Sequence, residues 1–175
     1  MRHLWFLVIS LAALILAGCS EEAPPGMPKP FALTEEAMGR YCGMNVLEHA
    51  GPKGQIILGP EPIWFSSARD AVAFTMLPEE PKNYSAIYVS DMSKAPSWDN
   101  PGAENWIDAR TAFYVIGSSA QGGMGAAETV PFSTKEMADQ FAQANGGQVV
   151  TFENIPVDYV LGSDHTRASG TRSEE

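Results

Sequence analysis

The pattern of apolar and polar residues predicts a strand, a helix and another strand in the first half of the chain. An apolar run at residues 56–58, bounded by glycines, is typical of a buried strand. Residues 68–76 then place apolar side chains at a helical period, with serines before them to cap the helix and Pro78 to end it. A further apolar run at 86–89 predicts the strand that follows.

The same layout returns in the second half at a constant spacing. The aligned pairs include Phe65 with Phe132, Ala71 with Ala138, and Phe74 with Phe141. Apolar runs at 112–116 and 148–152 predict strands on either side of the second helix, in which Ser133 and Glu136 would form a capping box. The chain is therefore predicted to have an α+β fold of two similar ββαβ units in tandem.

Segments rich in proline, glycine or polar residues separate these elements and predict the limits of the domains. We assign residues 34–110 to the first unit and 111–161 to the second. The first unit holds a long loop at 90–105, and the second holds a glycine-rich loop at 118–125. The polar tail at 162–175 is predicted to be disordered.

The first residues have the pattern of an export signal. A short polar start, an apolar stretch and small residues ahead of Cys19 predict a signal peptide at 1–18 and resemble the bacterial lipobox, whose cysteine is lipidated. Acyl chains on Cys19 would hold the protein at a membrane on its periplasmic side, and Ser20 favours the outer membrane. The proline-rich residues 19–33 are predicted to form a flexible tether.

Charge and cysteine count narrow the possible functions. The formal net charge of −10 disfavours a nucleic-acid partner, because phosphate binding needs clustered Lys and Arg. Once Cys19 is lipidated, Cys42 is the single thiol left in an oxidising compartment. Such a cysteine is either buried and inert, or reactive, or a metal ligand.

Cys42 stands in a segment that gathers soft metal ligands. Met44 and His49 follow it closely, and a thiol, a thioether and an imidazole together suit Cu(I) better than calcium or magnesium, which prefer oxygen ligands. In the second unit Met124 lies between glycines, which let the backbone approach a ligand. The alternative is that Cys42 and Met44 fill the core, His49 caps a turn and Met124 is an exposed loop residue or fills a gap.

Two other functions remain open from the residues alone. Cys42 and His49 could form the nucleophile and base of a thiol-dependent enzyme, although no sequence signature supplies an orienting third group. An acidic lipoprotein could also serve only as a scaffold for partner proteins. Nucleotide binding is disfavoured because the glycine-rich segment 118–123 lacks a phosphate-binding lysine.

Together these motifs resemble the NosL family of periplasmic lipoproteins. The resemblance rests on the lipobox, on Cys42-Gly43-Met44 with the segment from His49 to Gln55, on Gly123-Met124-Gly125 with Glu128, and on the segments around Phe65 and Phe132. It implies a duplicated ββαβ fold similar to that of organomercurial lyase, and a copper chaperone rather than an enzyme. It also implies delivery of Cu(I) for the copper-sulfide centre of nitrous oxide reductase and docking on the associated ABC-transporter machinery.

Carried over to this chain, the resemblance implies that Cys42 is the principal thiolate ligand, with Met44, His49 and Met124 as candidate partners. Cys42 and Met124 fall in different units. A shared site therefore requires the two units to bring both glycine-methionine loops together at the seam between them. We expect Met124 to approach Cys42 closely only when the metal is bound.

Overall fold

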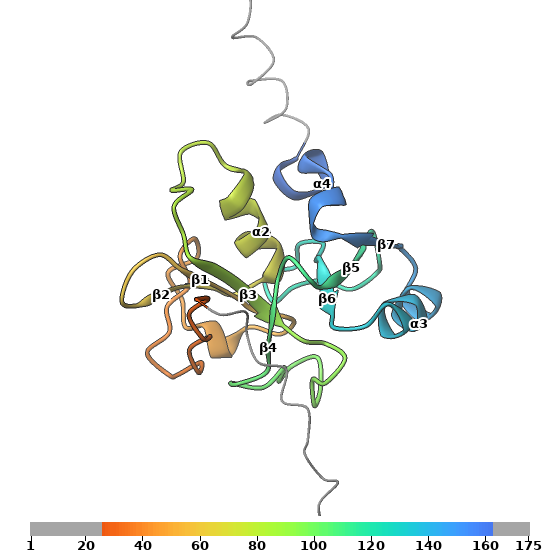
Figure 1. The fold of residues 1–175 in the computed structure, drawn as a ribbon. Coiled ribbons are helices and arrows are strands. Elements are labelled where there is room, and N and C mark those ends of the chain that lie inside the picture. The colour runs from red at the N-terminus through yellow and green to blue at the C-terminus, as the bar shows by residue number, and fades with distance from the viewer. Residues whose placement is uncertain (1–25, 163–175) are drawn as a thin grey trace, which may run out of the picture.

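The computed structural model describes residues 26–162, which form two antiparallel sheets with helices packed on them (Figure 1). In chain order the elements are the 3-10 helix η1 (Val46–Glu48), strands β1 (Gly54–Ile57) and β2 (Pro62–Phe65), helix α2 (Ala68–Met76), strands β3 (Ala86–Ser90), β4 (Trp106–Asp108), β5 (Phe113–Ile116) and β6 (Val130–Phe132), helix α3 (Lys135–Asn145), strand β7 (Gln148–Thr151), the 3-10 helix η2 (Phe152–Asn154) and helix α4 (Val157–Leu161).

The first sheet has the order β2-β1-β3-β4, and α2 connects β2 to β3. Helix α2 begins at its N-cap Ser67, whose side chain accepts the backbone N–H of Asp70. Its buried residues face β1, where Gly54 leaves room for the helix, since a Cβ at Gly54 would lie 2.3 Å from the Cβ of Ala71. The apolar period predicted from the sequence is therefore the face that α2 packs on the sheet.

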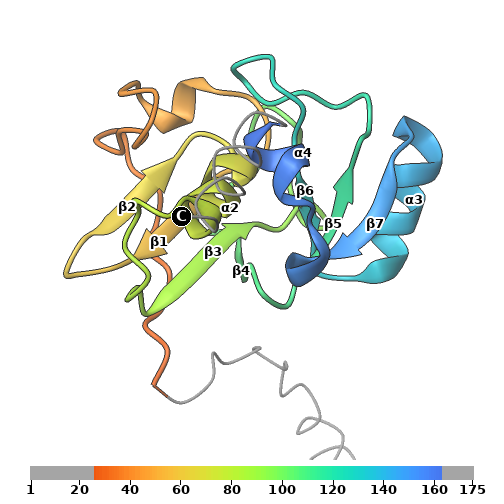
Figure 2. The same cartoon turned by 90° about the horizontal axis from the view of Figure 1, so that it is seen from above.

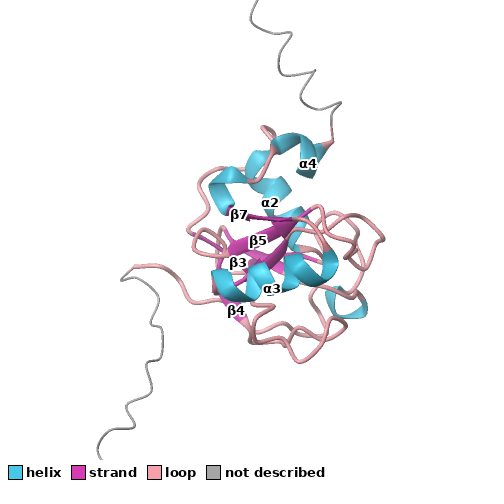
Figure 3. Cartoon of the chain, turned by 90° about the vertical axis from the view of Figure 1, so that its right-hand side faces the viewer, coloured by secondary structure: helices cyan, strands magenta, loops and turns pink. Residues whose placement is uncertain are grey.

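The second sheet repeats this arrangement with the order β6-β5-β7, and α3 connects β6 to β7. Seen from above, the two sheets lie side by side, with α3 on the outer side of the second (Figure 2). Viewed from that side, α3 lies in front of the strands (Figure 3). The order of strands and the place of the helix agree in both halves, which confirms the prediction of two similar ββαβ units.

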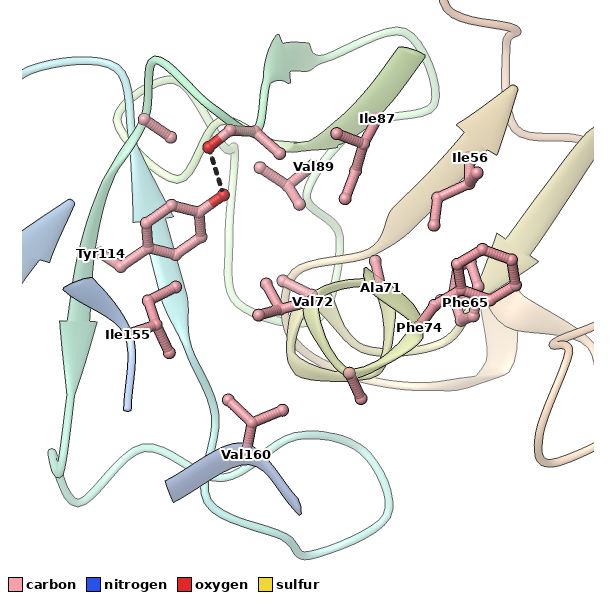
Figure 4. Packing of buried hydrophobic residues seen from close by; sticks show 14 residues of the cluster. Ile56, Phe65, Ala71, Val72, Phe74, Ile87, Val89, Tyr114, Ile155 and Val160 are labelled. Atoms are coloured by element: carbon pink, nitrogen blue, oxygen red, sulfur yellow. Dashed lines mark hydrogen bonds between the residues drawn. The ribbon is translucent and has the colours of Figure 1, made fainter. Parts of the chain in front are cut away.

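The largest apolar core cluster spans the two units. Its buried residues include members of β1, β2, α2 and β3 in the first unit and of β5 and the chain after β7 in the second. Tyr114, Ile155 and Val160 face Val72 and Val89 across the junction (Figure 4). The hydroxyl of fully buried Tyr114 donates to the carbonyl oxygen of Ala109, 2.7 Å away, so the core encloses no unpaired phenol.

A hydrogen bond connects the residue after β3 with the residue after β6, close to the start of the second helix. This bond changes which residue caps that helix. The backbone N–H of Ser133 donates to Oδ1 of buried Asp91 at 3.0 Å. The N-cap is the next residue, Thr134, whose hydroxyl accepts the N–H of Met137. The capping box predicted from Ser133 to Glu136 is therefore wrong by one position, because Asp91 holds the backbone of Ser133.

The strand β4 is a second difference from the sequence-based expectation. Residues 106–108 pair with the end of β3, as an edge strand directly after the loop predicted at 90–105. The short helices η1 and α4 were also not predicted. Each of these elements is only three to five residues long, so none carries enough periodicity to be recognised from sequence.

The segment from 26 to 33 packs against the first sheet, whereas the prediction placed a flexible tether at 19–33. Phe31 and the side chain of Gln55 exchange two hydrogen bonds, and the hydroxyl of Tyr88 donates to the carbonyl oxygen of Pro28 at 2.6 Å. Leu33 is buried beside the half-buried Trp64 and Trp106. A tether can therefore comprise only residues that precede this segment.

Several predictions fall outside the described residues, namely the signal peptide at 1–18, lipidation of Cys19 and the tail beyond residue 162. Within residues 26–162, no helix combines the length and apolar character needed to cross a membrane.

Candidate metal site

Cys42 lies at the tip of a tight reversal of the chain that precedes η1. The backbone N–H of Gly39 donates to the carbonyl oxygen of Met44 at 2.9 Å, and the N–H of Gly43 donates to the carbonyl oxygen of Gly39 at 2.8 Å. Gly43 has a φ of 64°, a value that glycine adopts without strain. The Cys-Gly-Met sequence is therefore part of the turn itself, and both sulfur-bearing residues lie in one short segment.

The thiol of Cys42 is half-buried and has one nearby side-chain partner. Its Sγ lies 3.5 Å from the Oγ of Ser66, a buried residue at the end of β2. Behind it is Gly39, where an added Cβ would lie only 2.6 Å from Sγ. A glycine at this position therefore makes room for the sulfur.

The two methionines of the predicted site are exposed to solvent. Met44 is 40% exposed and Met124 is 57% exposed, so neither thioether fills the core. Met124 stands in a tight turn in which the N–H of Gly125 donates to the carbonyl oxygen of Gly122 at 2.8 Å, and Gly125 has a φ of 75°. Both sulfur atoms are thus accessible to an incoming metal ion.

The turn that carries Met124 rests directly on the first unit. The backbone N–H of Gly123 donates to the carbonyl oxygen of Ala50 at 3.0 Å. A Cβ at Gly123 would lie 2.7 Å from the Cβ of His49, so the approach depends on glycine. The fold therefore brings the methionine loop, residues 122–125, against the segment that continues from Cys42 and Met44.

The two glycine-methionine sequences do not occupy equivalent places in the repeat. Gly43 and Met44 precede β1, whereas Gly122 to Gly125 lie between β5 and β6. Their similarity in sequence is therefore not a product of the duplicated fold. The two segments meet because the loop before β6 reaches across the seam to the chain before β1.

His49 is buried, with 8% of its surface exposed, and its Nε2 has no hydrogen-bond partner. Its carbonyl oxygen accepts a hydrogen bond from the ammonium group of Lys53. An unpaired ring nitrogen in a buried position is unusual, because buried polar atoms are nearly always hydrogen-bonded. A metal ion is one of the partners that a neutral imidazole nitrogen can take.

Two buried charges near these segments were not among the predicted site residues. Lys53 and Glu128 are each 1% exposed. Burial lowers the pKa of Lys53 to about 8, an effect that the charge of Glu128 opposes. Burial raises the pKa of Glu128 to about 7, although hydrogen bonds from the backbone of Arg69 and Thr129 and the hydroxyl of Ser67 oppose that shift. The sequence signal was limited to their place in two segments that carry the family resemblance, His49 to Gln55 and Gly123 to Glu128.

Within the part of the chain that the structure describes, no three His, Cys, Asp or Glu side chains gather closely enough to hold a metal ion. A site at Cys42 would therefore draw further ligands from thioether sulfur. Cys42 and Met44 share one turn, and His49 lies a few residues later in the chain, at the end of η1. Met124 stands on the loop that packs against His49. This donor set matches the preference of Cu(I) for soft ligands.

Comparison with known proteins identifies relatives that are described as copper-binding. The model of the NosL family matches residues 30–160. The chain is 45% identical to the copper-binding lipoprotein NosL of Achromobacter cycloclastes over 162 residues, which cover 91% of this chain and 83% of the relative. It is 33% identical to the copper-binding lipoprotein NosL of Stutzerimonas stutzeri over 150 residues, which cover 85% and 78%.

A solved structure supports the same relationship. The crystal structure of the copper chaperone NosL from Shewanella denitrificans has a TM-score of 0.68 and 34% identity to this chain, and the match covers 75% of this chain and 97% of that one. The relatives are described as copper-binding lipoproteins or a copper chaperone, and not as enzymes. The resemblance inferred from the sequence is thus confirmed, and the chain belongs to the NosL family.

Proposed function

We propose that this protein is a periplasmic chaperone that binds Cu(I) between its two units. The observation that carries the proposal is the packing of the Met124 loop on the His49 segment, which begins at the Cys42 turn. Thiolate and thioether sulfur are the ligands that select Cu(I). The copper-binding names of the relatives support the same cargo.

The arrangement suits a carrier that must also release its metal. Cys42, Met44 and His49 lie on one continuous segment, so a half-site built from them belongs to the first unit alone. Met124 adds a ligand from across the seam, and linking two half-sites in one chain gives the second a high effective concentration. The exposed thioethers of Met44 and Met124 can then be replaced one at a time by ligands of a recipient.

The recipient and location follow from the family resemblance. We infer that copper is delivered for assembly of the copper-sulfide centre of nitrous oxide reductase, with docking on the associated ABC-transporter machinery. Lipidation of Cys19 would anchor the carrier to a membrane, with the outer membrane favoured, and leave the folded units in the periplasm.

Competition titration tests the proposed ligands. The mature protein is titrated with Cu(I) against a chromophoric chelator, alongside Cys42→Ser, Met124→Leu and Met137→Leu. Met137 is the matched control because it is an exposed methionine on α3, away from the site. Loss of a group that only supports a metal ligand typically costs about 10- to 100-fold in affinity, so loss of the Cys42 thiolate should exceed about 100-fold.

Met124→Leu should weaken binding by about 100-fold, the lower end of the gain from linking two half-sites, while Met137→Leu should bind like the parent protein. Equal Cu(I) affinity in the parent and in Cys42→Ser would refute the role proposed for the thiolate. A loss of Cu(I) affinity in Met137→Leu as large as that in Met124→Leu would show that the assay responds to any exposed methionine.

A further inference from the structure

A pair of opposite charges is buried at the seam between the two units. Lys53 comes from the chain just before β1, and Glu128 comes from the chain just before β6. Both side chains are 1% exposed, which is rare for these residue types unless they are paired. No salt bridge joins them within residues 26–162, although the charge of Glu128 opposes the effect of burial on the pKa of Lys53.

Lys53 is attached to the His49 segment. Its ammonium group donates to the carbonyl oxygen of His49, and its backbone N–H donates to the Oγ of Ser90 at 3.0 Å. The lysine therefore links the segment of the soft ligands to the end of β3. Lys53 thus binds the carbonyl oxygen of His49, while the ring Nε2 of His49 has no hydrogen-bond partner.

Glu128 has one oxygen fully engaged and one oxygen aimed at the methionine loop. Its Oε1 accepts from the hydroxyl of Ser67 at 3.3 Å, the N–H of Arg69 at 2.8 Å and its neighbour's N–H at 2.9 Å. Its Oε2 has no hydrogen-bond partner and would lie 2.9 Å from a Cβ at Gly122. Oε2 therefore lies next to Gly122, the first residue of the turn that carries Met124.

We propose that Lys53 and Glu128 are positioning residues for the copper site, Lys53 holding the His49 segment and Glu128 supporting the methionine loop. This inference rests on the proposed function, because it states that the two residues set the distance between the two half-sites. Lys53 fixes one half-site and Glu128 supports the other, on opposite sides of the seam. The pair itself does not contact the metal.

The energetics of buried pairs explain why a single change would matter. Removing one partner leaves the other as an uncompensated buried charge, which is strongly unfavourable, whereas removing both is far less costly. A change at Glu128 also alters the contact of its side chain with Gly122, so the methionine loop would separate more easily from the His49 segment.

Glu128→Gln is the most informative variant. Glutamine keeps the volume and one oxygen for the donors from Ser67 and Arg69, so the start of α2 stays capped. It removes the negative charge that lies next to Gly122 and that opposes the effect of burial on Lys53. Thr134→Ala is the control for general loss of stability, because it removes the N-cap of α3, which typically costs about 1 kcal/mol, without touching the seam.

The first readout needs no copper. In the metal-free protein, hydrogen exchange of the Gly123 amide, which is bonded to Ala50, reports whether the loop is docked. We expect Glu128→Gln to speed this exchange by about tenfold relative to amides of α3, as local opening does. The same exchange rate at Gly123 in Glu128→Gln and in Thr134→Ala would overturn the inference.

The second readout is Cu(I) affinity in a double-mutant cycle. Glu128→Gln should weaken binding by about tenfold in the parent protein, the scale of a supporting residue, and far less in a Met124→Leu background, where the loop no longer supplies a ligand. Equal losses in both backgrounds would mean that Glu128 does not act through the loop. If Met124→Leu alone has no effect, the shared site fails, while the exchange measurement still tests the pair.

A second variant guards against misfolding of the single change. Lys53→Met with Glu128→Gln removes both charges and should restore stability lost by either alone. It should not restore the Cu(I) affinity, because the His49 carbonyl has lost its ammonium donor. Recovery of full affinity in this double variant would show that only the buried charge mattered, and would contradict a positioning role.

Discussion

The backbone N–H of Gly123 donates a hydrogen bond to the carbonyl oxygen of Ala50, 3.0 Å away. This contact joins the loop before β6 to the chain before β1, at a distance in sequence that no local element could bridge. It requires the chains to approach to backbone contact, since a Cβ on Gly123 would lie 2.8 Å from the backbone nitrogen of Ala50. The relation between the two halves of the proposed site is therefore built into the fold.

Gly123→Ala should separate the loop from the His49 segment. The added methyl group would press on His49 and Ala50, and overpacking of this kind typically costs about 1–3 kcal/mol. We expect a lower urea midpoint for unfolding and weaker Cu(I) binding. Gly59→Ala is the control because no atom lies within 4 Å of its Cβ position and its backbone is not left-handed. Unchanged Cu(I) affinity in Gly123→Ala would argue against a docked loop as part of the site.

Gly39→Ala should displace the thiol of Cys42 with little effect on the fold. The new Cβ would meet Sγ at 2.6 Å, and a sulfur at the end of a side chain can rotate away more easily than backbone can move. The thiol would then leave the hydroxyl of Ser66. We expect faster alkylation of Cys42 and about tenfold weaker Cu(I) binding, with nearly unchanged stability. A large loss of stability without a change in alkylation rate would contradict this placement of the thiol.

The buried pair predicts an unusual dependence of stability on pH. The pKa of Glu128 rises from its ordinary value of 4.5 to about 7 on folding, so between these values the folded protein holds a proton that the unfolded chain has released. Stability therefore falls as pH rises through this window, by about 3 kcal/mol for the isolated group. Lys53 acts oppositely at higher pH, because its pKa falls from 10.5 to about 8 and stability should rise again between these values.

Urea unfolding of the metal-free protein at pH 5, 7.5 and 9.5 measures this profile, which should have its minimum near the middle value. Glu128→Gln should lose the fall between pH 5 and 7.5. The carboxylate of Asp91 does not interfere, because hydrogen bonds from Ser133 and Ser93 outweigh the effect of burial and lower its pKa, placing its titration below pH 5. A parent protein that is more stable at pH 7.5 than at pH 5 would contradict the burial of Glu128.

The repeated fold could be predicted because each long element carries its own periodicity. The apolar spacing of α2 and α3 and the matching phenylalanines that end β2 and β6 mark the two units directly in the sequence. Strand β4 could not be predicted in this way. Its three residues become a strand only by pairing with the end of β3, and the sequence between them gives no indication of that partner.

The site was predictable only in part, for a similar reason. Cys42 and Met44 are recognisable because both soft ligands lie in one turn. The relation of Met124 to them depends on a loop crossing the seam, and the shared glycine-methionine sequence suggested it for the wrong reason, since the two segments are not equivalent in the repeat. Lys53 and Glu128 lie in segments that carry the family resemblance, but the sequence does not show that they are buried, because charged residues are ordinarily exposed.

The most direct test of the shared site is X-ray absorption at the copper edge of Cu(I)-loaded protein that contains selenomethionine. The Met44→Leu variant is used so that Met124 is the remaining predicted thioether ligand, and it is compared with Met44→Leu combined with Met124→Leu. We predict a copper–selenium bond in the first variant and none in the second, with copper–sulfur scattering from Cys42 in both. A spectrum of Met44→Leu without copper–selenium scattering, or the same scattering in both variants, would contradict binding of Cu(I) between the two units.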